Sequence, residues 1–187
     1  MPQSRRSQAA PSFEIRGGKA RESTVGAQAR RRLAQTIVID RERKRVLLAF
    51  HKSGRWRGFY TGFLDEVLAD EDPGAAAIRI VAEQASITIS RSEHIATFTF
   101  ISKAWTAADE FEFLAESHRG VPREVETIRP EWFAIDSIPY ARMPADDAIW
   151  YPAFLAGKRM RGRFHFAGDG TTLLSHEIEE VDRIETS

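Results

Sequence analysis

Hydrophobic and polar residues alternate in several short segments along most of this chain. The clearest are 95–101 (IATFTFI) and 110–115 (EFEFLA), whose period of two predicts half-buried strands. Similar alternation, or β-branched runs bounded by turn residues, predicts further strands at 35–40, 46–50, 131–135, 162–166 and 172–181. A charged turn after the first run, and Gly168-Asp169-Gly170 near the end, predict a hairpin at each end of the folded region.

Two segments have the composition of helices. Pro73 suits a first helical turn with Asp72 as the N-cap, and the alanine-rich residues that follow predict a helix ending near Ser86. A second helix is predicted from about Asp146 to Gly157. Strands on both sides of a central helix, with another helix late in the chain, predict an α+β fold in which mixed sheets are sandwiched between helices.

The composition is that of a soluble protein with a single domain. The 187 residues are 42% hydrophobic and 29% charged, and the 27 basic residues balance 27 acidic ones. No apolar run approaches the roughly 20 residues that span a bilayer, and the absence of cysteine excludes disulfides and thiolate metal sites. These features favour a cytoplasmic protein with a small-molecule ligand over one that binds nucleic acid or a membrane.

The first 32 residues differ from the rest of the chain. They contain eight basic and two acidic residues, a net charge of +6, and little apolar periodicity. We therefore predict a flexible basic arm over 1–32 and a folded domain over 33–187. Arg5-Arg6 lies near the start, but no apolar segment of about 7–15 residues follows, which argues against an export signal. A solvated tail is favoured over a nucleic-acid-binding arm.

Three separate blocks of sequence, in order along the chain, carry a family resemblance. The first contains Arg45-Val46-Leu47-Leu48 and Gly54-Arg55-Trp56-Arg57-Gly58-Phe59, the second is the region of the first predicted helix, and the third comprises 129–133, 143–152 and 162–166. Over roughly residues 33–184 the chain resembles the Nudix hydrolases, in particular the MutT-like branch of oxidised-purine nucleoside triphosphatases. The resemblance implies a Nudix fold, an α/β/α sandwich with a central box helix and a late C-terminal helix, and descent from nucleoside triphosphate pyrophosphohydrolases.

The Nudix box, G-x5-E-x7-R-E-U-x-E-E-x-G-U with U a bulky aliphatic residue, is degenerate here. Aligned on Arg79, the chain supplies Glu71 for the first glutamate and Glu83 for one of the paired glutamates. Ile80 replaces the glutamate that follows the arginine, and Gln84 replaces the second of the pair. By resemblance, Glu71 and Arg79 have a structural role. Glu83 is either a metal ligand or the ion-pair partner of Arg79, four residues earlier.

These replacements bear on the cofactor. In the family, this helix presents carboxylates to Mg²⁺, which bridges phosphate oxygens and activates water. Ile80 offers no oxygen and Gln84 only a neutral carbonyl, so we expect Mg²⁺ to be bound weakly or not at all. If hydrolysis survives, Glu83 is the expected metal ligand, and Glu83 and Gln84 are the expected catalytic pair. The acidic segment 65–72 either supplies replacement ligands or forms a solvated loop.

The sequence matches the family more closely at the residues for base recognition than it does in the box. Asp146 and Asp147 match the paired aspartates that read purine edges in the family. Two like charges held together can raise one pKa, so that one carboxyl donates a hydrogen bond while the other accepts. Asp146 could instead cap the second helix. Arg57 stands where the family has a neutral asparagine, and Pro144 where it has a tryptophan, so we expect Arg57 to contact the ligand.

Three further candidates have two interpretations each. Phe98 and Trp150 either line the ligand pocket or belong to the core. His51, on the strand before the box, either acts as an acid/base near phosphate or is structural.

Three hypotheses for the function remain. The first is a Nudix-family enzyme that binds a nucleotide-like or planar heterocyclic ligand and whose metal-dependent hydrolysis is weakened. The second uses the same pocket for metal-independent acid/base chemistry on a non-nucleotide substrate, through Asp146, Asp147 or His51. The third is a non-catalytic binding or regulatory protein whose basic arm engages a partner.

Overall fold

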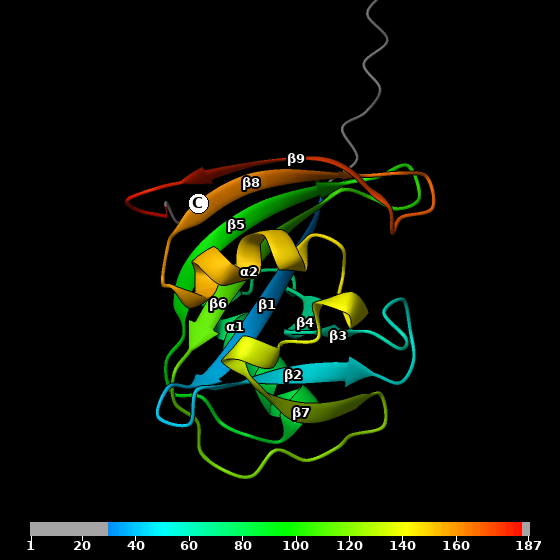
Figure 1. Cartoon of the computed structure of the whole chain (residues 1–187). Helices are drawn as coiled ribbons and strands as arrows, with labels where there is room; N and C mark the ends of the chain where they lie inside the picture. Colours follow the sequence, from blue (N-terminus) through cyan, green and yellow to red (C-terminus); the bar gives the residue numbers. More distant parts are fainter. Residues whose placement is uncertain (1–29, 185–187) are drawn as a thin grey trace, which may run out of the picture.

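The computed structural model describes residues 30–184 (Figure 1). The predicted basic arm lies largely outside these residues. Strand β1 begins at Arg31, so the folded domain starts two residues before the predicted boundary, and the first strand is longer than the run 35–40. Arg31 and Arg32 belong to this strand, and Arg31 pairs with Glu66 on the neighbouring strand β4.

Nine strands of the described residues form one mixed sheet, in the order β3-β2-β1-β6-β5-β8-β9, with β4 paired to β1 and β7 to β2. Two strand pairs, β1 with β6 and β5 with β8, are parallel, and the others are antiparallel. The strands are β1 (Arg31–Asp40), β2 (Arg45–His51), β3 (Tyr60–Thr61), β4 (Phe63–Glu66), β5 (Glu93–Ile101), β6 (Ala108–Ala115), β7 (Ile128–Ala134), β8 (Met160–Phe166) and β9 (Leu173–Glu180).

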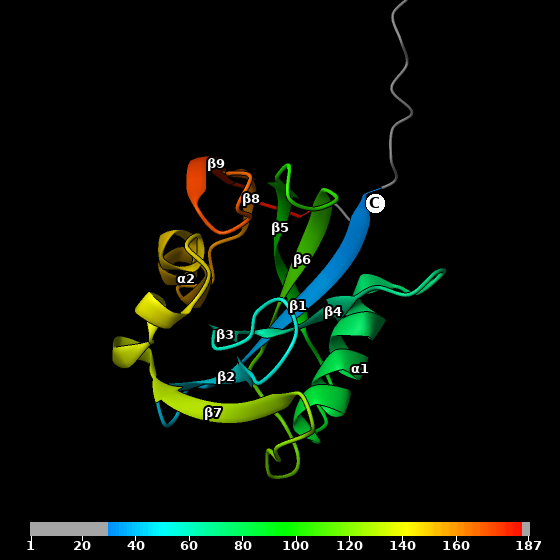
Figure 2. The same ribbon diagram turned by 90° about the vertical axis from the view of Figure 1, so that its right-hand side faces the viewer.

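Helices cover both faces of the sheet. Figure 2 shows α1 (Pro73–Ala85) and α2 (Asp147–Leu155) on opposite sides of β1, and two short 3-10 helices, η1 (Ile135–Ser137) and η2 (Tyr140–Arg142), precede α2. The period of two along β1 sends Ala34 and Val38 into the core under α1, and Ile37 and Ile39 into the core under α2. The α+β sandwich predicted from the sequence is therefore confirmed.

The first helix begins and ends where its sequence predicts. The side chain of Asp72 accepts hydrogen bonds from the N–H groups of Gly74 (2.9 Å) and Ala75 (3.1 Å). Pro73 occupies the first turn, where a backbone N–H has no partner within the helix, so its lack of an N–H costs no helical hydrogen bond. Ser86 ends the helix in the left-handed conformation, with φ of 56°. This helix follows the short strand β4 and packs against β1, β4 and β7.

The second helix differs from its prediction at the N-terminus. Asp146 precedes α2, but its side chain makes no capping hydrogen bond. It accepts instead from the indole Nε1–H of Trp150 at 3.0 Å, so the interpretation of Asp146 as a cap is wrong. The helix is short, contains Pro152 and buries Trp150, Tyr151 and Phe154 in the core. The helix thus fills the core and carries Asp146 and Asp147 at its N-terminus.

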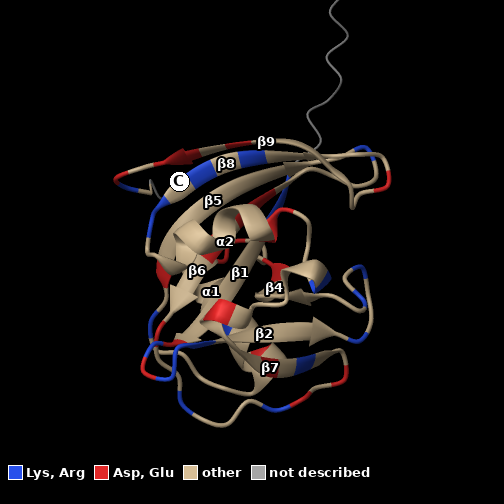
Figure 3. Cartoon of the chain, in the orientation of Figure 1, with Lys and Arg blue, Asp and Glu red and all other residues tan. Residues whose placement is uncertain are grey.

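The sheet beyond β5 carries paired charges on its outer strands. Figure 3 shows basic segments on β8 and acidic segments on β9. The antiparallel register places Arg161 opposite Glu179 and Arg163 opposite Glu177, and opposite charges on facing positions stabilise a strand pair. Within the described part of the chain, neither helix is long and apolar enough to cross a membrane.

Candidate ligand-binding site

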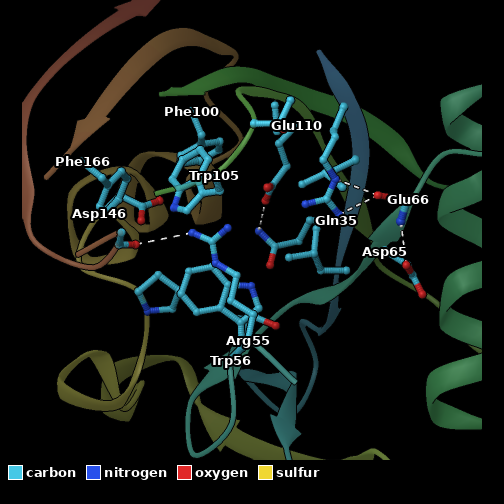
Figure 4. A pocket seen from close by; sticks show the side chains of 18 of the residues that line it. Gln35, Arg55, Trp56, Asp65, Glu66, Phe100, Trp105, Glu110, Asp146 and Phe166 are labelled. Carbon is cyan, nitrogen blue, oxygen red and sulfur yellow. Dashed lines mark hydrogen bonds and ion pairs between the residues drawn. The ribbon is translucent and has the colours of Figure 1, made fainter. Parts of the chain in front are cut away.

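A cavity of about 230 Å³ opens where the N-terminus of α2 meets β1 and β6 (Figure 4). Its polar lining comes from Gln35 on β1, Glu110 on β6, Arg55 in the β2–β3 loop, and the adjacent Asp146 and Asp147. Its aromatic lining consists of Trp56, Phe100, Trp105 and Phe166. A cavity with aromatic walls and convergent polar groups has the general character of a small-molecule site.

The aspartate pair lies at one side of this cavity and is almost fully buried. Asp146 and Asp147 are each 3% exposed. Burial raises the pKa of Asp146 to about 6, although the hydrogen bond from Trp150 opposes the shift. Burial raises the pKa of Asp147 well above its usual range, and the neighbouring Asp146 and Glu110 raise it further. Oδ2 of Asp147 has no hydrogen-bond partner among the described residues, so this carboxyl can still bind a ligand.

A second carboxyl pair, which the sequence analysis did not single out, lies beside the first. Glu110 and Glu112 on β6 are 7% and 0% exposed. Gln35 donates from Nε2 to Glu110 Oε1 at 3.1 Å and to Glu112 Oε2 at 3.0 Å. Burial raises the pKa of Glu110 to about 7 and that of Glu112 well above its usual range, with the Glu110 charge as the next cause for Glu112.

The signal for this pair was present in the sequence. Residues 110–115 alternate as a half-buried strand, and this pattern puts the two glutamates on the same face of it. However, the predicted sandwich covers both faces of a central strand, so a polar position in the middle of β6 is buried. The parallel register of β1 and β6 then places Gln35 opposite Glu112. Gly62 completes the arrangement because its N–H donates to Gln35 Oε1 at 2.8 Å, and a Cβ there would lie only 2.7 Å from the Gln35 side chain.

Arg55 lines the cavity, and Arg57 does not. The guanidinium of Arg55 lies over the rings of Trp56 and Trp105, and desolvation lowers its pKa. Arg57 is exposed two residues further along the same loop, where its N–H donates to the carbonyl of Gly54 in a turn. The expected ligand contact of Arg57 therefore has no support in the lining of the cavity, which includes Arg55 instead, although Arg55 is also an exposed residue.

Phe98 and Trp150 belong to the core beneath the cavity and not to its lining. Both are almost fully buried, and their ring centroids are 5.3 Å apart. The aromatic wall predicted from these two residues is supplied by Phe100 and Phe166, whose centroids are 6.3 Å apart. Trp150 still contributes to the site because its N–H holds Asp146.

Glu71 and Arg79 form a bidentate ion pair below the sheet. Arg79 Nε and Nη2 donate to the two carboxylate oxygens of Glu71, each at 2.8 Å, and Nη2 also donates to the carbonyl of Glu66 at 3.0 Å. The guanidinium lowers the pKa of Glu71 to about 2. The pair thus ties the loop before α1 to the helix, which agrees with a structural role.

The other box positions have different surroundings. Ile80 is fully buried in the core under α1. Glu83 is exposed and pairs with Arg79 at 3.1 Å. Gln84 donates from Nε2 to the carbonyl of Leu64 at 2.9 Å, while its Oε1 is buried without a partner among the described residues. None of the three is among the residues that line the cavity.

His51 is held away from the cavity by Thr61. Its Nε2 lies 2.7 Å from Thr61 Oγ1, and that hydroxyl already donates to the carbonyl of Gly62. The imidazole must therefore donate through Nε2–H, and burial lowers its pKa to about 4. His51 is a neutral donor at pH 7, which favours the structural interpretation over an acid/base role.

The fold and this site together define a Nudix domain. Residues 30–154 match the NUDIX domain, and the chain belongs to this family. The oxidized purine nucleoside triphosphate hydrolases of Danio rerio and Mus musculus are each 35% identical to it, over 149 and 150 residues, which is 79% of this chain and 94% of each relative. A MutT protein from Bacillus halodurans superposes with a TM-score of 0.70 at 24% identity, covering 80% of this chain and 97% of that one. The predicted Nudix fold is confirmed.

Nudix enzymes typically use Mg²⁺, and the residues present here do not fit such a site. Hard divalent cations require several anionic oxygen ligands. The box helix offers one carboxylate, Glu83, which is already paired with Arg79, and one neutral amide oxygen on Gln84. Across residues 30–184, no group of three or more His, Asp or Glu side chains is arranged to hold a metal ion. In the acidic segment 65–72, Asp72 caps α1, Glu71 pairs with Arg79 and Glu66 pairs with Arg31.

Proposed function

We propose that this Nudix domain binds a nucleotide-like or other planar heterocyclic ligand through Asp146 and Asp147, and that its metal-dependent hydrolysis of phosphoanhydrides is weak. One observation carries the proposal: the buried aspartate pair is present at the cavity, whereas the box helix lacks two of the carboxylates that would hold the metal. In this proposal, the aspartate pair for ligand recognition is retained, whereas part of the carboxylate set for metal-dependent catalysis is missing.

The aspartate pair offers a ligand both a donor and an acceptor. Burial raises the pKa of Asp146 to about 6 and that of Asp147 well above its usual range, so the adjacent carboxyls can share a proton, one donating a hydrogen bond and the other accepting. Heterocyclic edges carry donors and acceptors side by side, and Trp56 and Trp105 provide faces on which a ring can stack. Because the two relatives are hydrolases of oxidized purine nucleoside triphosphates, this ligand class is the first to test.

Weak hydrolysis follows from the donor set of the box helix. Without Mg²⁺ held next to the phosphate chain, charge that develops in phosphoryl transfer loses its main stabilisation. Ile80 lies in the core and Gln84 is bonded to Leu64, so neither side chain compensates.

A thermal-shift titration tests both halves of the proposal. The chain is melted with a panel of purine nucleoside triphosphates, including oxidised ones, at increasing Mg²⁺, and turnover is measured beside the mouse relative. We expect nucleotide to raise the melting temperature with little dependence on Mg²⁺, and turnover at least about 100-fold below that of the relative. Turnover equal to the relative's would contradict weak hydrolysis, and no stabilisation by any nucleotide would contradict the ligand class.

Metal-independent acid/base chemistry is a second candidate, and Glu110 is the observation that favours it. Its carboxyl lines the cavity and has a pKa near 7, where a group can both take and give a proton. In that case Glu110→Gln would abolish turnover of a non-phosphorylated substrate in the presence of EDTA, whereas phosphoanhydride hydrolysis would respond to Mg²⁺ instead.

A further inference from the structure

The guanidinium of Arg55 occupies a slot between two tryptophan side chains of the cavity. Its Cζ lies 4.9 Å from the ring centroid of Trp56 and 4.4 Å from that of Trp105, and Figure 4 shows the group between the two indoles. Its Nη2 donates a hydrogen bond to the carbonyl of Gly170 that is long, at 3.4 Å. Stacking on the two rings is therefore the main contact that holds Arg55 in the cavity.

The wall formed by Trp105 is built into the fold. Trp105 packs against Phe166 on β8, with centroids 6.1 Å apart. Gly170 in the β8–β9 loop has φ of +71°, and a Cβ there would lie 2.8 Å from Nε1 of Trp105. Only glycine allows the loop and the indole to approach this closely. The wall thus depends on two neighbouring loops, one between β5 and β6 and the other between β8 and β9.

The lining of the cavity has a strong excess of acidic groups. It contains two arginines, Arg31 and Arg55, against five carboxyl groups, namely Asp65, Glu66, Glu110, Asp146 and Asp147. Arg31 pairs with Glu66 at 2.6 Å, which leaves Arg55 as the arginine of the lining that faces the buried carboxyls.

Two buried carboxyl groups lack a hydrogen-bond partner for one oxygen among the described residues: Asp147, in the lining, and Glu112, behind it. Gln35 donates one N–H to Glu110 and the other to Glu112, which exhausts its donors and leaves Glu112 Oε1 without a partner among the described residues. Asp147 Oδ2 is likewise unpartnered, nearly fully buried and part of the lining. Buried carboxyl oxygens without partners are costly unless a donor or a cation satisfies them.

We infer that the slot between Trp56 and Trp105 is a binding site for a planar, delocalised cation, and that Arg55 is its internal occupant, which such a ligand replaces. Amidinium, guanidinium and protonated amino-heterocycles have this chemistry. The inference uses the pocket of the proposed function and adds the charge of the ligand's planar head. A neutral ring that displaces Arg55 loses both the cation–π contact and the attraction to Glu110, whereas a cationic ring restores both.

Benzamidine and benzamide provide a matched pair of probes, because they share a shape and differ in charge. Calorimetric titration of the full chain should show benzamidine binding at least about tenfold tighter than benzamide. Arg55→Ala removes the internal occupant and should tighten benzamidine binding by about threefold to tenfold. Arg57→Ala removes the same charge from an exposed position of the same loop and should change nothing. Glu110→Gln should weaken benzamidine binding about tenfold and leave benzamide unchanged.

Each outcome decides the matter. Equal affinity for the two probes, or weaker benzamidine binding in Arg55→Ala, overturns the inference, the second because Arg55 would then be part of the wall. If Glu110→Gln melts early, Asp147→Asn replaces it as the carboxyl variant, with the same expectation. Nucleotide binding without benzamidine binding overturns this inference and leaves the proposed function intact. Benzamidine binding with the Arg55 and Glu110 responses, but no nucleotide binding, supports the inference and rejects the proposed ligand class.

Discussion

The indole N–H of Trp150 donates to Oδ2 of Asp146 at 3.0 Å, across one turn of α2. This bond joins a core residue to a residue of the cavity lining, and it explains why Asp146 does not cap the helix that it precedes. A tryptophan N–H can only donate, so it stabilises the ionised carboxylate and lowers a pKa that burial raises. The core residue Trp150 thus opposes the effect of burial on the pKa of a carboxyl in the cavity lining.

Asp147→Asn is expected to weaken binding of a purine-like ligand by at least about tenfold and to leave the melting temperature unchanged or higher. The variant removes a buried carboxyl whose pKa is raised, so the fold loses no favourable ionic contact. Calorimetry and thermal melting measure the two effects. Asp136→Asn, on the exposed helix η1, is the matched control and should change neither. Normal ligand binding by Asp147→Asn would remove the aspartate pair from the proposed site.

The helices and strands could be predicted from the sequence, but the positions of several side chains in the candidate site could not. The caps of α1 were predictable because they depend on neighbours in the chain, as Asp72 and Gly74 show. Contacts across the sheet were not, since the bond from Gln35 to Glu112 depends on which strand lies beside β1. The loop between β2 and β3 shows the same limit, because the resemblance predicted a ligand contact for Arg57, whereas the cavity lining contains Arg55.

Glu71→Gln should lower the free energy of unfolding by about 1–3 kcal/mol, because it breaks a partly buried bidentate pair with Arg79. The pKa of Glu71 falls from 4.5 to about 2 in the fold, so this stabilisation is present above pH 4.5 and is lost as the pH falls toward 2. Urea unfolding at pH 7 measures the loss. Lys158→Gln, which breaks an exposed pair with Glu180, should cost less than about 0.5 kcal/mol. If the two variants lose the same free energy of unfolding, the pair of Glu71 and Arg79 stabilises the fold no more than an exposed ion pair does.

Restoring the box glutamates should have unequal results at the two positions. Ile80→Glu places a carboxylate in the core under α1 and should destabilise the fold by about 3–5 kcal/mol. Gln84→Glu loses the hydrogen bond to Leu64 and should cost about 1–2 kcal/mol, part of which Mg²⁺ recovers if the new carboxylate binds the metal. Melting temperatures with and without Mg²⁺ test this. If Mg²⁺ does not raise the melting temperature of Gln84→Glu, one added carboxylate is not enough to restore a metal site.

Removal of residues 1–29 should leave the melting temperature within about 2 °C of the full chain, because their composition favours solvation over burial. Removal through residue 34 should lower it by several times that amount, since it deletes the start of β1 with the ion pairs of Arg30 to Asp109 and Arg31 to Glu66. A large drop for the shorter deletion would mean that the basic segment packs against the domain.

Stability should fall as the pH rises from about 5 to about 8, and Glu110 should account for much of the slope. Its pKa rises from 4.5 to about 7 in the fold, so the folded state holds more protons than the unfolded state between these values. The penalty reaches on the order of 3 kcal/mol once the pH exceeds 7. Glu112, Asp146 and Asp147 face Glu110 and act in the same direction, whereas Arg55 opposes them.

Glu110→Gln isolates this contribution. The variant should match the unmodified chain in urea unfolding at pH 5 and be more stable at pH 8, because it keeps a neutral group of similar size beside Gln35. Glu126→Gln, at an exposed position, should leave the slope unchanged. The pH range stays above 4.5 because Asp40 and Glu71, whose pKa values are about 2, contribute a slope of opposite sign at lower pH. If both variants keep the slope of the unmodified chain, Glu110 is ionised in the fold at neutral pH, and its carboxylate is then a permanent anion at the edge of the Arg55 slot.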